Sequence, residues 1–184
     1  MEDKSSRDLA CGREECSMPT THTDDQTLKM KRFADLAADL FNQDQACLDL
    51  ARTAAQLCDS PIALVSLKVG ERLWFHTRVG LDVKEIPSRE SFCECAMQFS
   101  DKVLVVEDAR ADPRFAANAL VTGPLGIRFY TGAPLVTSKQ EVLGNLCVLD
   151  SKPKKMKPEQ LEMLTFLSKQ VAARLEEKLN DLTQ

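Results

Sequence analysis

Two cysteines separated by one residue, Cys93 and Cys95, have the clearest capacity for chemistry in this sequence. They follow Ser91 in the string Ser-Phe-Cys-Glu, which fits a capping box, in which the serine caps a helix and Glu94 reaches back to the cap. Cys93 would then lie in the first helical turn, where backbone N–H groups stabilise a thiolate. Three roles follow for the pair: structural thiols, redox sensing, or metal binding together with His76.

The structural role is favoured, because a free cysteine often behaves as a small hydrophobic residue. A disulfide between Cys93 and Cys95 would strain the helix, since residues two apart point in diverging directions. If the protein is an enzyme, Cys93 would be the nucleophile, with Cys95 or Cys147 as the resolving thiol.

Charged side chains gather between residues 108 and 115, in the string Asp-Ala-Arg-Ala-Asp-Pro-Arg-Phe. Asp112 before Pro113 fits a helix N-cap followed by a first-turn proline, with Phe115 turned into the core. The same charges could bind an anionic or amide ligand, with Arg128 as a further forked donor. We favour the structural role, because pairing between aspartate and arginine explains both signs of charge without a ligand.

Five apolar runs predict strands, and alternation along them assigns side chains to faces. On the second strand, Leu73, Phe75 and Val79 would share one face and Trp74, His76 and Arg78 the other, facing solvent or a pocket. On later strands Tyr130, Arg128 and either Cys147 or Asn145 are comparable pocket candidates. The predicted strands are 61–69, 72–79, 103–106, 127–136 and 142–150.

Helical periodicity appears before and after these strands. It predicts helices over 28–41 and 45–57, and a long helix that begins near Pro158. A heptad-like seam runs along the last helix, and its C-terminal part predicts a helical dimer interface. The seam consists of Leu161, Leu164, Ser168, Val171, Leu175, Lys178 and Leu182.

The bulk properties exclude several classes of protein. The chain has 184 residues and a formal net charge of −4, and residues 1–27 hold seven acidic and three basic residues, so the rest is neutral. A neutral domain does not attract nucleic acid.

Apolar runs are too short for a membrane span, a secretory signal is lacking, and the seven cysteines are odd in number, which predicts a cytoplasmic protein with free thiols. Residues 1–27 are predicted to be a flexible acidic tail whose Cys11, Cys16 and His22 fit no structural zinc site.

Five strings in register resemble one bacterial branch of the GAF-domain family, from about Phe33 to Leu175: PIALVSL, WFHTRVGLD, SFC, VLVVEDARADPRFAANALVTGPLGIRFYTGAPLV and LGNLCVLD. The resemblance implies an α+β fold of the GAF/PAS-like kind, with an antiparallel central sheet of five to six strands backed by N- and C-terminal helices. It places the domain at 28–175 and a helical extension at 176–184. Cys95 departs from the branch, in which this position tends to be histidine.

The family binds small molecules between the sheet and its covering loops and passes the binding state through flanking helices. The resemblance therefore implies a regulatory sensor of a small molecule or of redox state, acting in signal transduction rather than as an enzyme. We expect a homodimer formed through the terminal helices, or a separate effector protein. We expect no metal, nucleic acid or membrane, and assign no cofactor. The expected ligand-binding residues are Trp74, His76, Phe92, Cys93, Asp108, Arg128, Tyr130 and Cys147.

Two alternatives stay open within the family. Free methionine-(R)-sulfoxide reductases are GAF proteins with cysteine nucleophiles, but their cysteine spacing and acidic pocket string do not occur here. GAF photosensors bind tetrapyrroles, but their Cys-His dipeptide is missing between Leu120 and Ile127, which leaves only a non-covalent version. The sequence pattern of cyclic-nucleotide-binding GAF domains is also missing.

Overall fold

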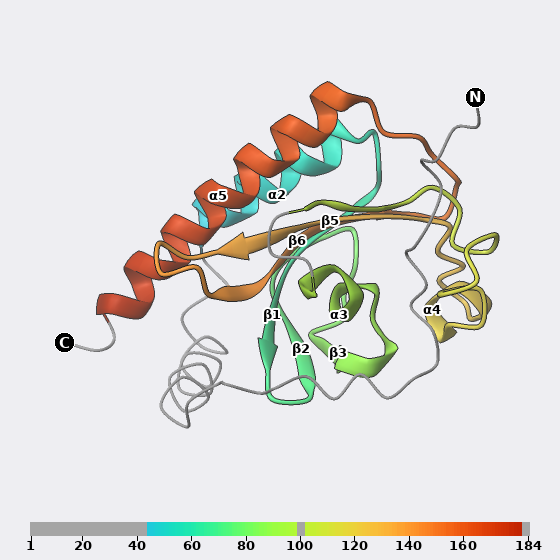
Figure 1. The fold of residues 1–184 in the computed structure, drawn as a ribbon, viewed down its shortest axis with the longest axis horizontal. Helices are drawn as coiled ribbons and strands as arrows, with labels where there is room; N and C mark the ends of the chain where they lie inside the picture. Colours follow the sequence, from blue (N-terminus) through green and yellow to red (C-terminus); the bar gives the residue numbers. More distant parts are fainter. Residues whose placement is uncertain (1–43, 99–101, 182–184) are drawn as a thin grey trace, which may run out of the picture.

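An antiparallel sheet of six strands organises the computed structural model, which describes residues 44–98 and 102–181 (Figure 1). Its spatial order is β3-β2-β1-β6-β5-β4. The sequence predicted every strand except the short β3. The strands are β1 Ile62–Val69, β2 Arg72–Val79, β3 Glu85–Pro87, β4 Leu104–Val106, β5 Phe129–Val136 and β6 Val142–Asp150.

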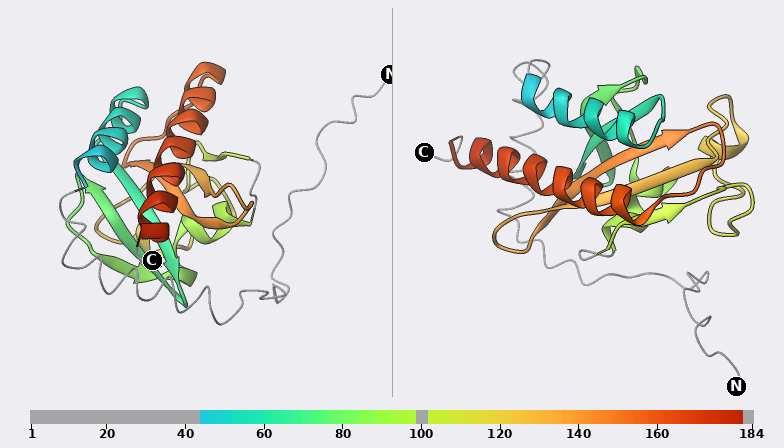
Figure 2. Two further views of the ribbon diagram at one scale, coloured as in Figure 1. Left: turned by 90° about the vertical axis from the view of Figure 1, so that its left-hand side faces the viewer. Right: turned by 90° about the horizontal axis from the view of Figure 1, so that it is seen from above.

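Helices lie on both sides of this sheet. The helices α2 and α5 pack side by side on one face, and α3 lies on the other (Figures 1 and 2). The predicted α+β class, with an antiparallel sheet backed by helices, is therefore confirmed. The predicted tail 1–27, the helix 28–41 and Leu182 lie outside the described residues. The helical segments are α2 Gln45–Leu57, the 3₁₀ turn η2 Ser88–Glu90, α3 Phe92–Met97, α4 Ala119–Thr122 and α5 Pro158–Asp181.

The central strands are apolar throughout because both of their faces are covered. On β1, Ala63, Val65 and Leu67 point toward α2 and α5, while Leu64 points toward α3. β5 alternates in the same way, with Phe129 toward α5 and Tyr130 toward α3. Two separate cores result, one on each face of the sheet.

A β-bulge corrects the face assignment on β2. Val65 pairs with Thr77 and Ser66 with Phe75, so His76 is an extra residue in β2. Such a residue reverses the alternation beyond it. The prediction that Val79 shares a face with Leu73 and Phe75 is therefore wrong, because Val79 packs against the core under α2 and α5.

The long helix α5 runs antiparallel to α2. The amide of Gln160 donates to the carbonyl of Leu57, at the end of α2, and Lys178 bonds Asp44, at its beginning. Most of the predicted dimer seam packs inside the domain instead of facing a partner, because Leu164, Ser168, Val171 and Leu175 are buried. Leu179 also packs against this core, so the helix stays in contact with the domain beyond residue 175.

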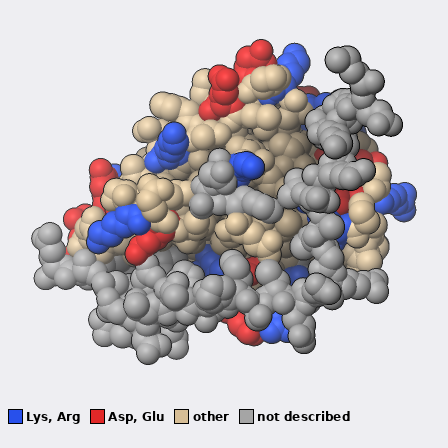
Figure 3. All heavy atoms as spheres, viewed as in Figure 1, with Lys and Arg blue, Asp and Glu red and all other residues tan. Residues whose placement is uncertain are grey.

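Among the described residues, no helix is long and apolar enough to cross a membrane. Acidic and basic side chains are interspersed over the face shown in Figure 3, without a large field of one sign.

Asp44 joins the two helices electrostatically. Its carboxylate accepts from the Cys47 amide as the N-cap of α2, bonds the Lys178 ammonium and lies 3.7 Å from the Arg174 guanidinium. Burial acts to raise the pKa of this carboxyl group, but the hydrogen bonds from Lys178 and from the Cys47 amide outweigh it, and the pKa is lowered from its usual value.

We expect Asp44→Asn to lower the free energy of unfolding at pH 7 by about 1–3 kcal/mol, because it removes charged hydrogen bonds but keeps a capping side chain. The pKa of the Asp44 carboxyl group is lower in the folded protein than in the unfolded chain, where it is about 4. Its contribution to stability is therefore complete above about pH 4 and is lost as the pH falls through the folded-state pKa. Urea unfolding at pH 7 and at low pH should therefore show the difference shrinking in acid. The control Asp49→Asn changes an exposed carboxylate of the same helix and should have little effect. Equal losses at both pH values would contradict this role.

Candidate functional site

An apolar cavity lies between the sheet and α3. Its volume is about 40 Å³, and one of its lining residues, Leu125 beside α4, is 38% exposed. β1, β2, β5 and β6 provide its floor, and α3, α4 and the neighbouring loops provide its cover. The lining residues are Ile62, Leu64, Phe75, Leu81, Val83, Ile86, Ser91, Phe92, Cys93, Leu120, Leu125, Ile127, Tyr130, Cys147 and Leu149.

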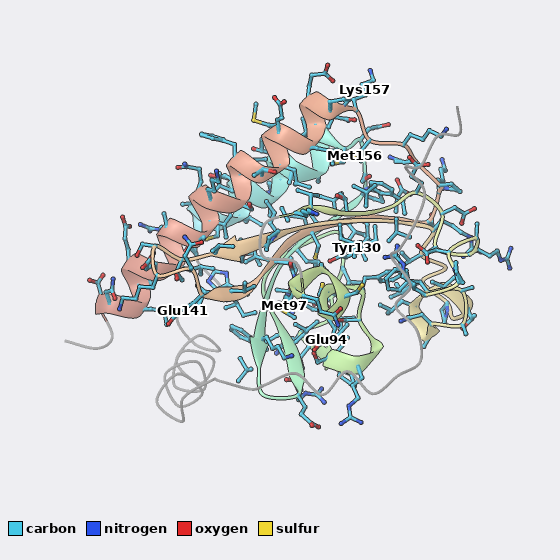
Figure 4. The ribbon with its side chains drawn as sticks, in the orientation of Figure 1. Glu94, Met97, Tyr130, Glu141, Met156 and Lys157 are labelled. Atoms are coloured by element: carbon cyan, nitrogen blue, oxygen red, sulfur yellow. The ribbon has the colours of Figure 1, made fainter. Side chains whose placement is uncertain are left out.

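Local hydrogen bonds hold α3 over the cavity. Ser91 caps the helix, because its hydroxyl oxygen accepts from the Glu94 amide at 3.2 Å. The second half of the expected capping box differs, since the Glu94 carboxylate accepts from the Ser88 hydroxyl and the Lys68 ammonium. Lys68 belongs to β1, so this ion pair, at 2.7 Å, ties α3 to the sheet. Figure 4 marks Glu94 on α3.

Four of the lining residues carry a polar side-chain atom: Ser91, which caps α3, and Cys93, Tyr130 and Cys147. The sulfur of Cys93, on α3, lies 3.8 Å from the sulfur of Cys147, on β6. The Tyr130 hydroxyl, from β5, donates to the Cys93 sulfur at 3.4 Å. The Cys147 sulfur lies within 3.5 Å of the Leu64 carbonyl oxygen. Three separate elements thus bring these groups together.

The two thiols differ in pKa because of the hydrogen bond between them and their other contacts. The hydrogen bond between Cys93 and Cys147 lowers the pKa of Cys93 against the opposing effect of burial, and the Tyr130 hydroxyl lowers it further. The same bond with Cys93, together with burial, raises the pKa of Cys147 well above its usual value. Burial first, and then the negative charge of Cys93, raise the pKa of Tyr130. Cys93 is therefore the more acidic thiol of the pair.

Aromatic stacking fixes the ring of Tyr130. The Phe92 ring stacks on the Tyr130 ring, with centroids 5.0 Å apart and an interplanar angle of 14°. The Phe115 ring in turn packs against the Phe92 ring, with centroids 4.6 Å apart. A Cβ atom at Gly132 would collide with the hydroxyl end of Tyr130. Gly132, two residues along β5, is thus required for the position of this ring. The sequence signal for this role of Gly132 is a glycine two residues from a tyrosine on the same strand face, and it was not among the predicted site residues.

A buried amide completes the polar groups beside the thiols. The side-chain amide of Asn145, on β6, donates to the Cys93 carbonyl oxygen at 3.1 Å. Its own side-chain oxygen is buried and has no hydrogen-bond partner among the described residues. The Ser66 hydroxyl donates to the Asn145 backbone carbonyl at 3.3 Å. A polar group thus remains available on this side of the sheet.

The structure brings together four of the eight expected ligand-binding residues: Phe92, Cys93, Tyr130 and Cys147 all line the cavity. It does not bring Trp74 and His76 there. Trp74 packs against the core under α2 and α5, on the opposite face of the sheet. His76 is the bulged residue; its Nδ1 lies 2.8 Å from the Thr77 hydroxyl, and burial lowers its pKa to about 4. It is therefore neutral at pH 7.

Asp108 and Arg128 lie outside the cavity wall. The Asp108 carboxylate accepts from the Arg110 amide, and the Arg128 guanidinium donates to the Val121 and Ile127 carbonyls at 3.2 Å. Both side chains thus order the cover, which agrees with the structural interpretation of this charged segment.

Asp112 also has a structural contact but caps no helix. Its carboxylate accepts from the amide and the guanidinium of Arg114, within a series of turns. The Arg114 hydrogen bond outweighs burial and lowers the pKa of Asp112. Phe115 is buried, as predicted.

The arrangement limits the chemistry of the site. The described residues contain no group of three or more His, Cys, Asp or Glu side chains that could hold a metal ion. The cavity has room for a few water molecules or a ligand of similar size. In this conformation it accommodates neither a tetrapyrrole nor methionine sulfoxide, so either ligand would require the cover to open.

A two-sided antiparallel sheet, with packed helices on one face and a covered cavity on the other, defines a sensor-type α+β domain. The family model for the GAF domain matches residues 42–175, and the chain belongs to this family. The chain is 39% identical over 133 residues to a cyclic di-GMP phosphodiesterase of Pseudomonas aeruginosa, which covers 72% of this chain. It spans only 22% of that relative.

Solved structures confirm the fold. The GAF domain of a phosphoenolpyruvate-protein phosphotransferase from Acinetobacter superposes with a TM-score of 0.57 at 17% identity, covering 82% of this chain and 92% of that one. A type II free methionine-R-sulfoxide reductase from Thermoplasma acidophilum gives a TM-score of 0.56 at 18% identity, over 82% and 96%. At these identities the likeness shows the fold alone.

We expect Gly132→Ala to displace the Tyr130 ring and to destabilise the protein by about 1–3 kcal/mol, as overpacking does. In a Tyr130→Leu background the same substitution should cost less, because the colliding hydroxyl end is absent. Urea unfolding of the four proteins measures this coupling. Additive effects would show that Gly132 and Tyr130 do not compete for the same space.

Proposed function

We propose that this GAF domain is a sensor module of signal transduction that binds a small, largely uncharged ligand in the cavity under α3. The observation that carries this proposal is the cavity wall, which is apolar apart from the side chains of Ser91, Cys93, Tyr130 and Cys147. Binding sites for small molecules commonly combine an apolar lining with a few placed polar groups.

The shared strands offer a route from the cavity to the helices. Tyr130 faces the cavity, while its neighbour Phe129 packs in the core under α5. A ligand that moves Tyr130 would therefore shift β5 beneath α5. The family and the resemblance to a cyclic di-GMP phosphodiesterase support a signalling role in which such a shift regulates an effector.

The exposed face of α5 supports self-association as the output. Met163 is 46% and Phe166 is 55% exposed, and residues three apart on a helix are neighbours. We propose that the homodimer uses this pair. It replaces the predicted seam, whose central members are buried within the domain.

The ligand proposal is tested with reduced protein. We expect a dialysable extract of the cells that produce the protein to raise its melting temperature, because ligand binding stabilises the folded state. Native mass spectrometry should then show a discrete added mass. Val83→Phe, which places a ring in the cavity, should abolish both effects, whereas Met163→Phe on α5 should retain them. An extract that neither binds nor stabilises the wild-type protein would contradict the proposal.

The dimer proposal predicts that Phe166→Asp yields monomers in analytical ultracentrifugation, because a charge would be buried in the contact. Ala117→Asp is the matched control, since it places the same charge at an exposed apolar residue away from both α5 and the cavity. It should leave the association unchanged. A wild-type protein that is monomeric at high concentration would refute this part of the proposal.

A further inference from the structure

The described domain contains two pairs of neighbouring cysteines with different geometry. Cys93 and Cys95 are close in sequence, but only Cys93 lines the cavity. Cys93 and Cys147 are 54 residues apart in sequence, yet their sulfurs are separated by 3.8 Å. Cys47 and Cys58 belong to the core on the other face of the sheet. Cys147 is therefore the described thiol placed to react with Cys93.

The two sulfurs need to move only a short distance to form a disulfide. A disulfide requires its sulfurs to lie about 2.05 Å apart, so the two must approach by a little under 2 Å. Cys147 lies in β6, which is bonded to β1 and β5 and is held in the middle of the sheet. Cys93 lies in the six-residue helix α3. Movement of α3 toward β6 would therefore supply the approach.

The contacts of the pair distinguish the roles of its members. The Cys93 sulfur accepts from the Tyr130 hydroxyl, which stabilises its thiolate, and it lies 3.8 Å from the Cys147 sulfur. Cys147 has a carbonyl oxygen, that of Leu64, within hydrogen-bond distance, which favours its protonated form. The arrangement fits a nucleophile at Cys93 and a resolving thiol at Cys147.

The cavity determines which oxidant can reach them. Both cysteines line its wall, and its volume of about 40 Å³ admits a molecule with the size of a few waters. The lining residue Leu125 is partly exposed, so solvent reaches the cover at that point. Hydrogen peroxide satisfies this limit in the conformation described, whereas larger thiol oxidants do not.

We propose that Cys93 and Cys147 are an oxidation site of this domain, at which hydrogen peroxide produces a reversible disulfide between α3 and β6. The Cys93 thiolate attacks peroxide, a sulfur–oxygen bond forms, the oxygen–oxygen bond breaks, and the leaving hydroxide takes up the thiol proton as water. The Cys147 thiol then attacks the sulfenic acid, the disulfide forms, and the hydroxyl leaves as water with the Cys147 proton. Peroxide gains the two electrons that the thiols lose. The reaction requires no other ligand, so it goes beyond the proposed binding function.

The test uses the full reduced chain and hydrogen peroxide. After treatment, remaining thiols are alkylated with N-ethylmaleimide in denaturant, and the protein is digested without reductant. Mass spectrometry should find a peptide pair linked through Cys93 and Cys147, lighter by two hydrogens and separated by dithiothreitol. This mapping of the wild-type protein needs no variant, so a folding defect cannot obscure it. Cys93 and Cys147 that remain fully alkylated after Cys95 has been oxidised would overturn the proposal.

Variants then assign the roles, with circular dichroism to confirm their fold. Cys147→Ser should stop at a Cys93 sulfenic acid that dimedone traps when it is added together with denaturant, and Tyr130→Phe should slow oxidation by about fivefold through loss of one hydrogen bond. The matched control is Cys95→Ser, which changes a thiol of the same helix and should retain the linked pair at the wild-type rate. A linked pair lost in Cys95→Ser would instead assign the chemistry to Cys95. The extract-binding test uses reduced protein, so either proposal can fail without the other.

Discussion

The central strands β1, β6 and β5 are covered on both faces, and the rest of the structure depends on this constraint. Every side chain along them must fit one of two cores, and the backbones must approach closely where the sheet is most buried. Gly144 illustrates the second requirement, because a Cβ atom there would collide with the Ser66 carbonyl of the neighbouring strand. Close approach of β1 and β6 thus sets the floor of the cavity.

Two-sided burial also explains why the polar groups under α3 interact with one another. A polar group removed from water is stable when it finds a hydrogen-bond partner. Cys93, Cys147 and Tyr130 satisfy one another, and Asn145 holds the Cys93 carbonyl. The same network that secures α3 therefore concentrates reactive groups next to the cavity.

Periodicity predicted the fold well, because buried strands and amphipathic helices impose patterns on the sequence itself. The range 45–57 agrees with α2, and the apolar runs agree with five strands. The three-residue β3 was missed, since so short a strand has no measurable alternation. Alternation also failed at His76, because one bulged residue reverses the faces and leaves no pattern in the sequence.

The candidate site was only partly predictable, for a related physical reason. Phe92, Cys93, Tyr130 and Cys147 were identified as individual residues, but their convergence depends on the pairing of β5 with β6 and on the placement of α3. Local sequence instead emphasised the spacing of Cys93 and Cys95, which helical geometry separates. Distances between strands, rather than spacing along the chain, decide which groups can react. The thiol opposite Cys93 is consequently supplied by β6, where the strand is already buried for reasons of packing.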